Sequence, residues 1–440
     1  MKRNYPLIAA AIATAAASSG AYAQLTPAGM AAAPYQLIIA GSSAASPTVL
    51  GIVENDPHLC AGTFLVLKSS GDTNFAGVTC NIATAQGSIP AGAQITVYYR
   101  SEGGSVVGAL PVSSGKSVLR LDPTQCTQTA PFTCTVTGAS STNGPNDTWT
   151  GAVTPGPVDL GVTDVEPAQL TNLDYPNNYK STVFGKASGA QLAALTTVPA
   201  LQQVFGLAIN EGGMGLPANT PINLSKETVA NILNGTLSTW NTVPNAATGA
   251  PVTTVALPIV LINREPGSGT RTATNMFFLN YQCGATTGIA QSGTVYYATG
   301  DELTAANGQN GALAYASINN LAPNSSSFPN LVMASINGVA PSTLAAAAGQ
   351  YEFWYEATLV PSQQAVTLNN AGAQGLSSYL QGAIATAATY SVNSDVNFIP
   401  GQGGNTASLP LAATTSGANT SYINVYTRGG NSCNIPSASN

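Results

Sequence analysis

The sequence predicts an α/β fold of two lobes, each a mostly parallel sheet flanked by helices. At three places an apolar segment runs into a turn of small residues and then into a segment with helical spacing. Such units are typical of parallel sheets, because a helix carries the chain back to begin the next parallel strand. Excluding residues 1–23 leaves 417 residues, more than one hydrophobic core usually holds, which favours two domains.

The first 23 residues have the features of a secretory signal peptide. Lys2 and Arg3 precede the apolar stretch 6–17, and Ala21-Tyr22-Ala23 forms a small-residue cleavage site before Gln24. Because no cysteine stands directly after that site, no lipid anchor is expected. We therefore expect a periplasmic or secreted protein.

The three strand–turn–helix units follow the chain in order. They consist of strand 35–40, turn 41–47 and helix 48–53; strand 94–99, turn 100–105 and a helix from Val106; and strand 255–262, loop 264–271 and helix 272–281. In such folds ligands gather where strand C-termini meet helix N-termini.

Further elements have clear local signals. Ser225 is a good N-cap for a helix that Gly235 ends. The remaining expectations are a small-residue strand at 311–316, a long strand at 351–360 that crosses between the lobes, a helix at 371–388, and a Ser/Thr/Pro-rich surface insertion at 112–157.

The loop Arg264-Glu265-Pro266-Gly267-Ser268-Gly269-Thr270-Arg271 has the composition of a small-anion site. Its Gly-Ser-Gly-Thr segment allows a tight turn, in which amides and two hydroxyls face one point. A helix N-terminus attracts negative charge through its unpaired N–H groups and its dipole. Arg264 adds a planar set of donors suited to an oxyanion.

Composition excludes several classes of function. From Gln24 onward, ten basic side chains face eighteen acidic ones, a formal charge of −8, so no basic surface for nucleic acid is expected. The chain has one histidine, His58. Multi-histidine metal sites are thereby excluded, and so are histidine-dependent triads unless His58 serves. We expect His58 to be a surface or helix-end residue, and we expect no cofactor and no metal.

Six cysteines in an oxidising compartment indicate disulfides. Spacing favours the local pairs Cys60/Cys80 and Cys126/Cys134, which leaves Cys283/Cys433 as a long-range pair. Fifteen connectivities are open in principle.

Six segments, taken together and in order, resemble the PstS-like phosphate-binding proteins, a family of class II periplasmic solute-binding proteins. They are Gly41 to Pro47, Ser101-Glu102-Gly103-Gly104, Asp159 to Asp164, Ser225 to Asn241, Arg264 to Thr270, and Gly311 to Tyr315.

The resemblance implies a type II periplasmic-binding-protein fold, whose two lobes close on an anion. Carried over by position, it implies ligand contacts from Ala45, Ser46, Ser101, Asp164, Arg264, Ser268, Gly269 and Thr270. An ionised Asp164 can only accept hydrogen bonds. Hydrogen phosphate can donate one, whereas sulfate cannot, so Asp164 would favour phosphate by about tenfold to hundredfold.

The chain departs from the family pattern at two places. Ala45-Ser46 stands where the family usually has Thr-Phe, and Pro266 stands where an acidic residue often holds the arginine. Purely structural roles also stay open for several residues. Asp164 could cap a helix, Ser46 and Ser101 could be turn residues, and Arg100 and Arg271 could be solvated or paired with acids.

The resemblance also implies an organisation and a setting. We expect lobe 1 over 24–205 and 356–440, lobe 2 over 206–355, a monomer, no enzymatic activity, and delivery of the anion to an inner-membrane ABC transporter. Two rivals are a secreted interaction protein that has lost the ligand, and a phosphohydrolase, which a single histidine disfavours.

Overall fold

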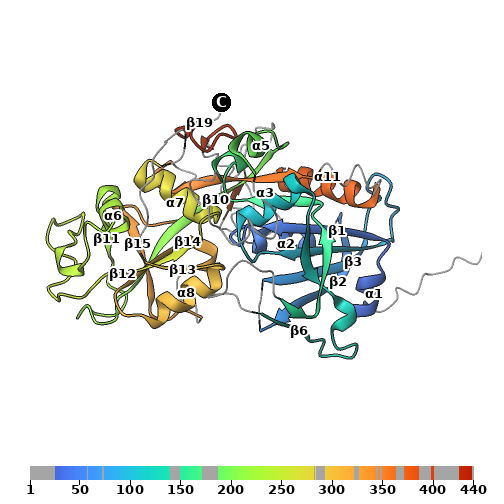
Figure 1. The fold of residues 1–440 in the computed structure, drawn as a ribbon, viewed down its shortest axis with the longest axis horizontal. Coiled ribbons are helices and arrows are strands. Elements are labelled where there is room, and N and C mark those ends of the chain that lie inside the picture. The colour runs from blue at the N-terminus through green and yellow to red at the C-terminus, as the bar shows by residue number, and fades with distance from the viewer. Residues whose placement is uncertain are drawn as a thin grey trace, which may run out of the picture.

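The computed structural model describes residues 25–438, apart from 57, 72–73, 139–148, 171–186, 282, 284–292, 322–326, 343–344, 347–348, 363–370, 386–397 and 401–425. The expected signal peptide lies outside the described residues. Figure 1 shows two bodies side by side, which we call the first half (β1–β4, α1–α3) and the second half (α6, α8, β11–β15).

The first half is built on parallel strands. β1 (Tyr35–Gly41) lies between β4 (Gln94–Arg100) and β9 (Leu160–Thr163) and is parallel to both. The sheet continues beyond β4 through antiparallel β3 (Phe75–Ile82) and β2 (Cys60–Ser70). The C-terminal ends of β1, β4 and β9 therefore meet at one edge.

The second half repeats this arrangement on a smaller scale. β12 (Val260–Arg264) lies between β13 (Thr294–Tyr296) and β14 (Ala312–Ser317), again parallel to both. The strand begins at Val260, later than the expected residue 255, and Val255 itself is exposed. β15 (Leu331–Ile336) pairs with the short β11 (Asn223–Leu224).

Two long strands join the halves. β10 (Val198–Asn210) pairs antiparallel with β14 and β15 and also with β16 (Trp354–Pro361), and β16 pairs with β9. One sheet thus runs through both bodies, as Figure 1 shows. The expected crossing strand at 351–360 is confirmed as β16, and the α/β fold class is confirmed.

Helices follow the site-bearing strands as expected. These are α2 (Ser46–Asn55) after β1, α3 (Ser105–Ser114) after β4 and α7 (Gly269–Leu279) after β12, with α8 (Thr299–Gly308) after β13. Ser225 is the N-cap of α6 (Lys226–Leu233), and its side chain accepts from the Thr228 N–H at 3.0 Å. α11 (Ala371–Ala385) is the expected late helix.

Short elements complete the chain. They are α1 (Pro27–Ala32), α5 (Gly189–Ala193), the 3-10 turns η1 (Pro123–Gln125), η2 (Pro167–Gln169), η3 (Trp240–Thr242) and η4 (Ile318–Asn320), and the strands β5 (Ser117–Leu121), β6 (Cys134–Thr137), β7 (Thr150–Gly151), β8 (Val153–Pro157), β17 (Phe398–Pro400), β18 (Tyr426–Thr427) and β19 (Ser437–Ala438).

The expected surface insertion at 112–157 is corrected in two respects. Residues 112–114 belong to α3, and β5 pairs with β8 across the segment. Val118, Leu121, Val136 and Trp149 are buried in the main hydrophobic cluster. The Ser/Thr/Pro-rich composition of the segment as a whole concealed these short strands.

Three disulfides are present, with the pairing that spacing favoured: Cys60–Cys80, Cys126–Cys134 and Cys283–Cys433. The third joins the chain just after α7 to the C-terminal hairpin of β18 and β19. We call residues 426–438 the C-terminal hairpin.

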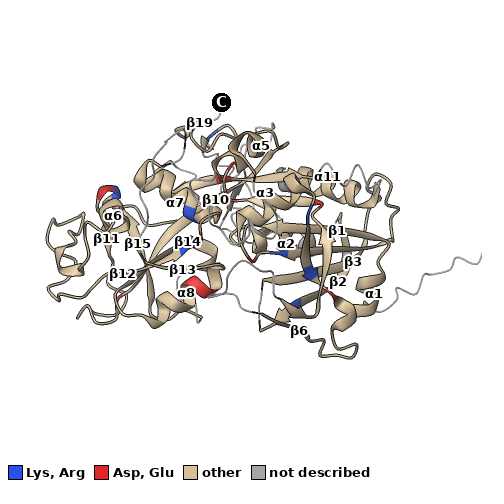
Figure 2. Ribbon diagram, viewed as in Figure 1, with Lys and Arg blue, Asp and Glu red and all other residues tan. Residues whose placement is uncertain are grey.

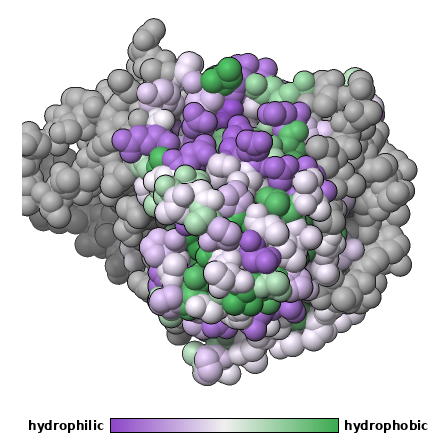
Figure 3. All heavy atoms as spheres, turned by 90° about the vertical axis from the view of Figure 1, so that its left-hand side faces the viewer, coloured by the Kyte–Doolittle hydropathy of each residue, from purple (hydrophilic) through white to green (hydrophobic). Residues whose placement is uncertain are grey.

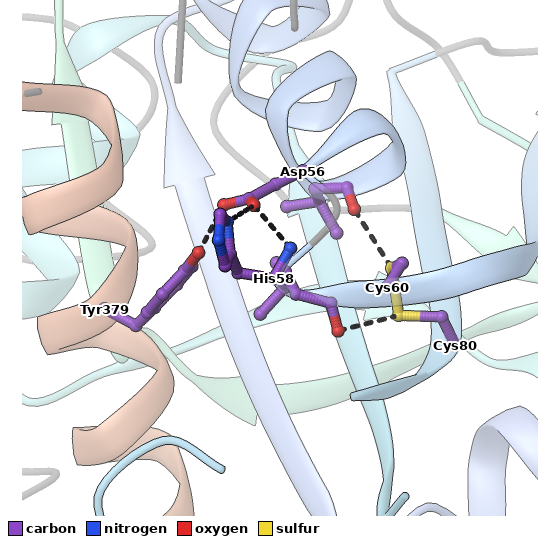
Figure 4. A network of polar contacts seen from close by, with 7 residues as sticks. Asp56, His58, Cys60, Cys80 and Tyr379 are labelled. Atoms are coloured by element: carbon purple, nitrogen blue, oxygen red, sulfur yellow. Dashed lines mark hydrogen bonds and ion pairs between the residues drawn. A yellow bond between two sulfur atoms is a disulfide. The ribbon is translucent and has the colours of Figure 1, made fainter. Parts of the chain in front are cut away.

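His58 has a structural setting. Its backbone N–H donates to Asp56 Oδ1 at 2.9 Å, its ring lies 3.3 Å from the same carboxylate, and its side chain is 72% exposed. Tyr379 of α11 also donates to Asp56, next to the Cys60–Cys80 disulfide (Figure 4). Burial, together with this bond, raises the pKa of Tyr379. The cluster fastens α11 to the end of α2.

Charged residues are sparse along the ribbon of both halves, as Figure 2 shows. On the end of the molecule seen in Figure 3, hydrophobic areas are interrupted by hydrophilic ones, which is usual for a face in contact with water. No helix among the described residues is long and apolar enough to cross a membrane.

Candidate functional site

Arg264 ends β12 and is fully buried. Its loop turns at Gly267, with φ at +96°, and α7 then begins with Ser268 as the N-cap, whose side chain accepts from the Arg271 N–H at 3.4 Å. The arginine and the helix N-terminus thus lie within one short loop, as the sequence predicts.

The Arg264 guanidinium reaches the first half of the protein. Nη1 donates to Thr299 Oγ1 at 2.6 Å and to Ser43 Oγ at 3.4 Å, while Nη2 donates to the Tyr297 carbonyl at 3.0 Å. The Ser43 and Thr299 hydroxyls lie 2.7 Å apart. Ser43 follows β1 and Thr299 begins α8, so this contact joins the halves.

Asp164, directly after β9, forms a second contact between the halves. Its carboxylate accepts from Ser42 Oγ and, at 3.1 Å, from Thr270 Oγ1 of α7. Burial raises the pKa of the Asp164 carboxyl, against the lowering effect of the Ser42 and Thr270 hydrogen bonds and the Arg264 charge. Its backbone N–H donates to Ser105 Oγ at 2.9 Å.

The N-termini of α3 and α7 face one another at the same place. The Val106 N–H donates to the Gly267 carbonyl at 3.0 Å. A Cβ placed on Gly269 would lie 2.2 Å from Ser105 Oγ and 2.6 Å from the Asp164 Cβ. Only glycine at position 269 lets the halves approach this closely.

Gly269→Ala is therefore expected to lower the free energy of unfolding by about 1–3 kcal/mol, the usual cost of overpacking. The methyl group meets atoms that two other elements hold in place, so it separates α7 from Asp164. Urea unfolding measures the change. Gly382→Ala in α11, where an added Cβ meets nothing within 4 Å, is the control. Equal stabilities for the two variants would contradict the close approach.

The structure brings some of the sequence-predicted residues together. Asp164, Arg264, Ser268, Gly269 and Thr270 surround the contact between the halves. The Ser101 side chain instead donates to Asn74 Oδ1 at 3.0 Å, beside the buried Arg100–Glu102 ion pair.

The first turn holds Ala45 and Ser46 at the start of α2. The Ala45 side chain packs in the first-half core, and its N–H donates to Ser42 Oγ at 2.9 Å. Ser46 is the half-buried first residue of α2. The hydroxyl that contacts the second half is that of Ser43, three positions earlier, while the Ser42 hydroxyl donates to Asp164.

Sequence reasoning missed four groups at this place: Ser42, Ser43, Ser105 and Thr299. The first two lie in the small-residue turn that had been singled out, and Ser105 begins the helix after the second turn. Composition alone did not distinguish which hydroxyl of each turn faces the other half.

This donor set suits an oxyanion. Hydroxyls, a guanidinium and two helix N-termini converge from both halves, and Asp164 adds an acceptor. The described residues contain no cluster of three His, Cys, Asp or Glu side chains that could hold a metal ion.

A family model described as a PBP superfamily domain matches residues 192–383. No curated protein matches the chain.

Several solved structures are similar at low identity. A Clostridium perfringens protein, described as a phosphate ABC transporter substrate-binding protein with bound phosphate, is 12% identical with a TM-score of 0.47, over 83% of this chain and 99% of that one. A Vibrio cholerae ABC-type phosphate transport receptor is 13% identical with a TM-score of 0.42, over 82% and 99%. A high-affinity periplasmic phosphate-binding protein, solved with phosphate, is 15% identical with a TM-score of 0.41, over 83% and 90%.

Proposed function

We propose that this chain, whose residues 192–383 match the PBP superfamily domain, is an extracytoplasmic solute-binding protein that holds phosphate or a similar tetrahedral oxyanion between its two halves. The observation that carries the proposal is the buried Arg264 guanidinium, which points across to Ser43 of the other half. In the part of the chain that the structure describes, no carboxylate forms an ion pair with Arg264. A buried cation without such a partner is costly, and an anion offsets that cost.

The anion would replace the direct contacts that now join the halves. Ser43, Thr270 and Thr299 have hydroxyls that bond to groups of the other half or to Arg264. When the halves separate, these donors become free for the oxygens of a ligand. Closure is then stabilised by contacts that the ligand makes to both halves.

Asp164 would select among oxyanions. Its carboxylate accepts from Ser42 and Thr270 and would accept the proton of hydrogen phosphate. In this role the protein acts as a monomer, without a cofactor and without catalysing a reaction, and passes the anion to an inner-membrane ABC transporter. The lobe boundaries 24–205, 206–355 and 356–440, and the ligand roles of Ala45, Ser46, Ser101 and Ser268, remain part of the proposal.

Isothermal titration calorimetry tests the proposal with the chain from Gln24 onward. Phosphate is expected to bind with measurable heat, and sulfate at least about tenfold more weakly. Absence of heat or fluorescence change with both anions would overturn it.

Asp164→Asn is expected to reduce the preference for phosphate over sulfate by about tenfold or more, because the amide can donate to sulfate. In the wild type, the preference should also fall as the pH drops toward the raised pKa of Asp164, because the protonated carboxyl becomes a donor. Competition titrations at pH 8, 6.5 and 5 measure both effects. An unchanged preference in the variant would assign Asp164 a structural role.

One observation favours a second function, an interaction protein without a ligand. The halves already bond directly through Ser43–Thr299 and Thr270–Asp164. If that were the functional state, neither the wild type nor Arg264→Ala would bind an anion detectably. Phosphate would then also not protect the wild type against unfolding by urea.

A further inference from the structure

Glu302 is a buried acid that the proposed binding site does not yet use. It lies in the first turn of α8, is fully buried, and accepts from the Tyr315 N–H at 3.1 Å through Oε1. Its Oε2 is buried and finds no hydrogen-bond partner among the described residues. Buried acceptors are almost always paired, so this oxygen calls for an explanation.

Arg264 has the complementary feature. Its Nε is buried and also finds no partner among the described residues. The two residues lie close together. The Arg264 side chain donates to Thr299, one turn before Glu302 on α8, and the Arg264 backbone N–H donates to the hydroxyl of Tyr315 at 3.4 Å. An unpaired donor and an unpaired acceptor thus belong to two residues that Tyr315 connects, through its hydroxyl to the Arg264 backbone and through its N–H to the Glu302 side chain.

We propose that Glu302 is a positioning residue for Arg264, and that its charge decides whether the guanidinium is available to an anion. The inference rests on the proposed function. When Glu302 is neutral, the Arg264 charge is free to attract the ligand. When Glu302 is ionised, it competes with the ligand for the same guanidinium.

The surroundings place this change of charge near physiological pH. Burial raises the pKa of Glu302 to about 8, against the lowering effects of the Arg264 charge and the Tyr315 N–H. α8 packs against β10, β12, β13 and β14. The ionisable groups on these strands are Arg264, Tyr296 and Tyr315, and Asp301 is the other acid of the first turn of α8.

The direction of the effect follows. Below about pH 8 Glu302 keeps its proton and the site retains the full positive charge of Arg264. As the pH rises through that value, Glu302 ionises and anion affinity falls. Its folded pKa is above the ordinary value, so the stability that the protonated form contributes is lost as the pH rises from the ordinary glutamate range to about 8.

The test compares wild-type protein and Glu302→Gln by calorimetric titration with phosphate between pH 6.5 and 9.5. Titration of phosphate itself cancels in the ratio of the two affinities. This ratio is expected to change by about tenfold across the range, with the wild type becoming the weaker binder at high pH. Glu227→Gln, on the exposed start of α6, is the matched control and should follow the wild type. A constant ratio for Glu302→Gln overturns the proposal.

A second measurement needs no anion. Urea unfolding of wild type, Glu302→Gln, Arg264→Gln and the double variant gives the coupling between the two side chains. Favourable coupling that grows from pH 7 to pH 9.5 supports the positioning role, and zero coupling at both pH values overturns it. If wild-type protein binds neither phosphate nor sulfate, the proposed function fails, and with it any role of Glu302 toward an anion. The coupling measured by urea unfolding of the four proteins then decides separately whether the Glu302 and Arg264 side chains interact.

Discussion

Arg264→Ala is expected to weaken phosphate binding by about 100-fold or more, since truncating a buried charged partner typically costs about 2–5 kcal/mol. The guanidinium is fully buried and provides two donor nitrogens at the contact between the halves. Arg264→Lys keeps the charge but loses the planar set of donors, so an intermediate loss is expected. Calorimetric titration with phosphate measures both.

The control for this prediction is Lys116→Ala, which removes one positive charge from an exposed position just after α3. It should bind phosphate as the wild type does. Equal weakening by Lys116→Ala and Arg264→Ala would mean that overall charge, and not the buried arginine, attracts the anion.

Removing the Cys283–Cys433 disulfide is expected to lower the free energy of unfolding by about 2–5 kcal/mol. It spans 150 residues and fastens the C-terminal hairpin to the chain after α7. The hairpin has strong contacts of its own: Arg428 stacks on Tyr355 at 4.2 Å, and Glu356 accepts from the backbone N–H groups of Arg428 at 2.9 Å and Gly430 at 2.7 Å.

The hairpin also contacts the site-bearing segment of the first half. Ser432 Oγ accepts from the Glu166 N–H at 2.9 Å, two residues after Asp164. In the variant with Cys283→Ser and Cys433→Ser, faster hydrogen exchange is therefore expected at Glu166 and across the hairpin.

Urea unfolding without reductant measures the loss. Cys126→Ser with Cys134→Ser is the control, because it opens a separation of only 8 residues and should cost less, about 2 kcal/mol. A larger loss in the control, or unchanged exchange at Glu166 in the test variant, would contradict the proposed anchoring of the hairpin.

The strand–turn–helix units could be predicted from the sequence because their signals are local. Apolar runs identified β1, β4 and β12, and small-residue turns marked the starts of α2, α3 and α7. Arg264, the last residue of β12, could be singled out for the same reason, whereas Asp164, directly after β9, was singled out by its place in a segment that resembles the family.

The facing hydroxyls could not be predicted in the same way. Gly41 has φ at +132° and a Cβ there would lie 1.9 Å from the Val162 carbonyl, so the turn leaves β1 close against β9. After that turn Ser43, and not Ser46, contacts the other half, and Ser42 donates to Asp164. Thr299 was missed because it reaches Arg264 from a separate helix, without a motif that marks it.

A crystal structure of the chain from Gln24 onward, grown with arsenate as an anomalous-scattering substitute for phosphate, tests the central claim most directly. It should show one anion within about 3 Å of the Arg264 guanidinium and of hydroxyls from both halves, with the direct Thr270–Asp164 contact replaced or rearranged. Retention of the direct Ser43–Thr299 and Thr270–Asp164 contacts at saturating arsenate, with no anomalous peak between the halves, would contradict it.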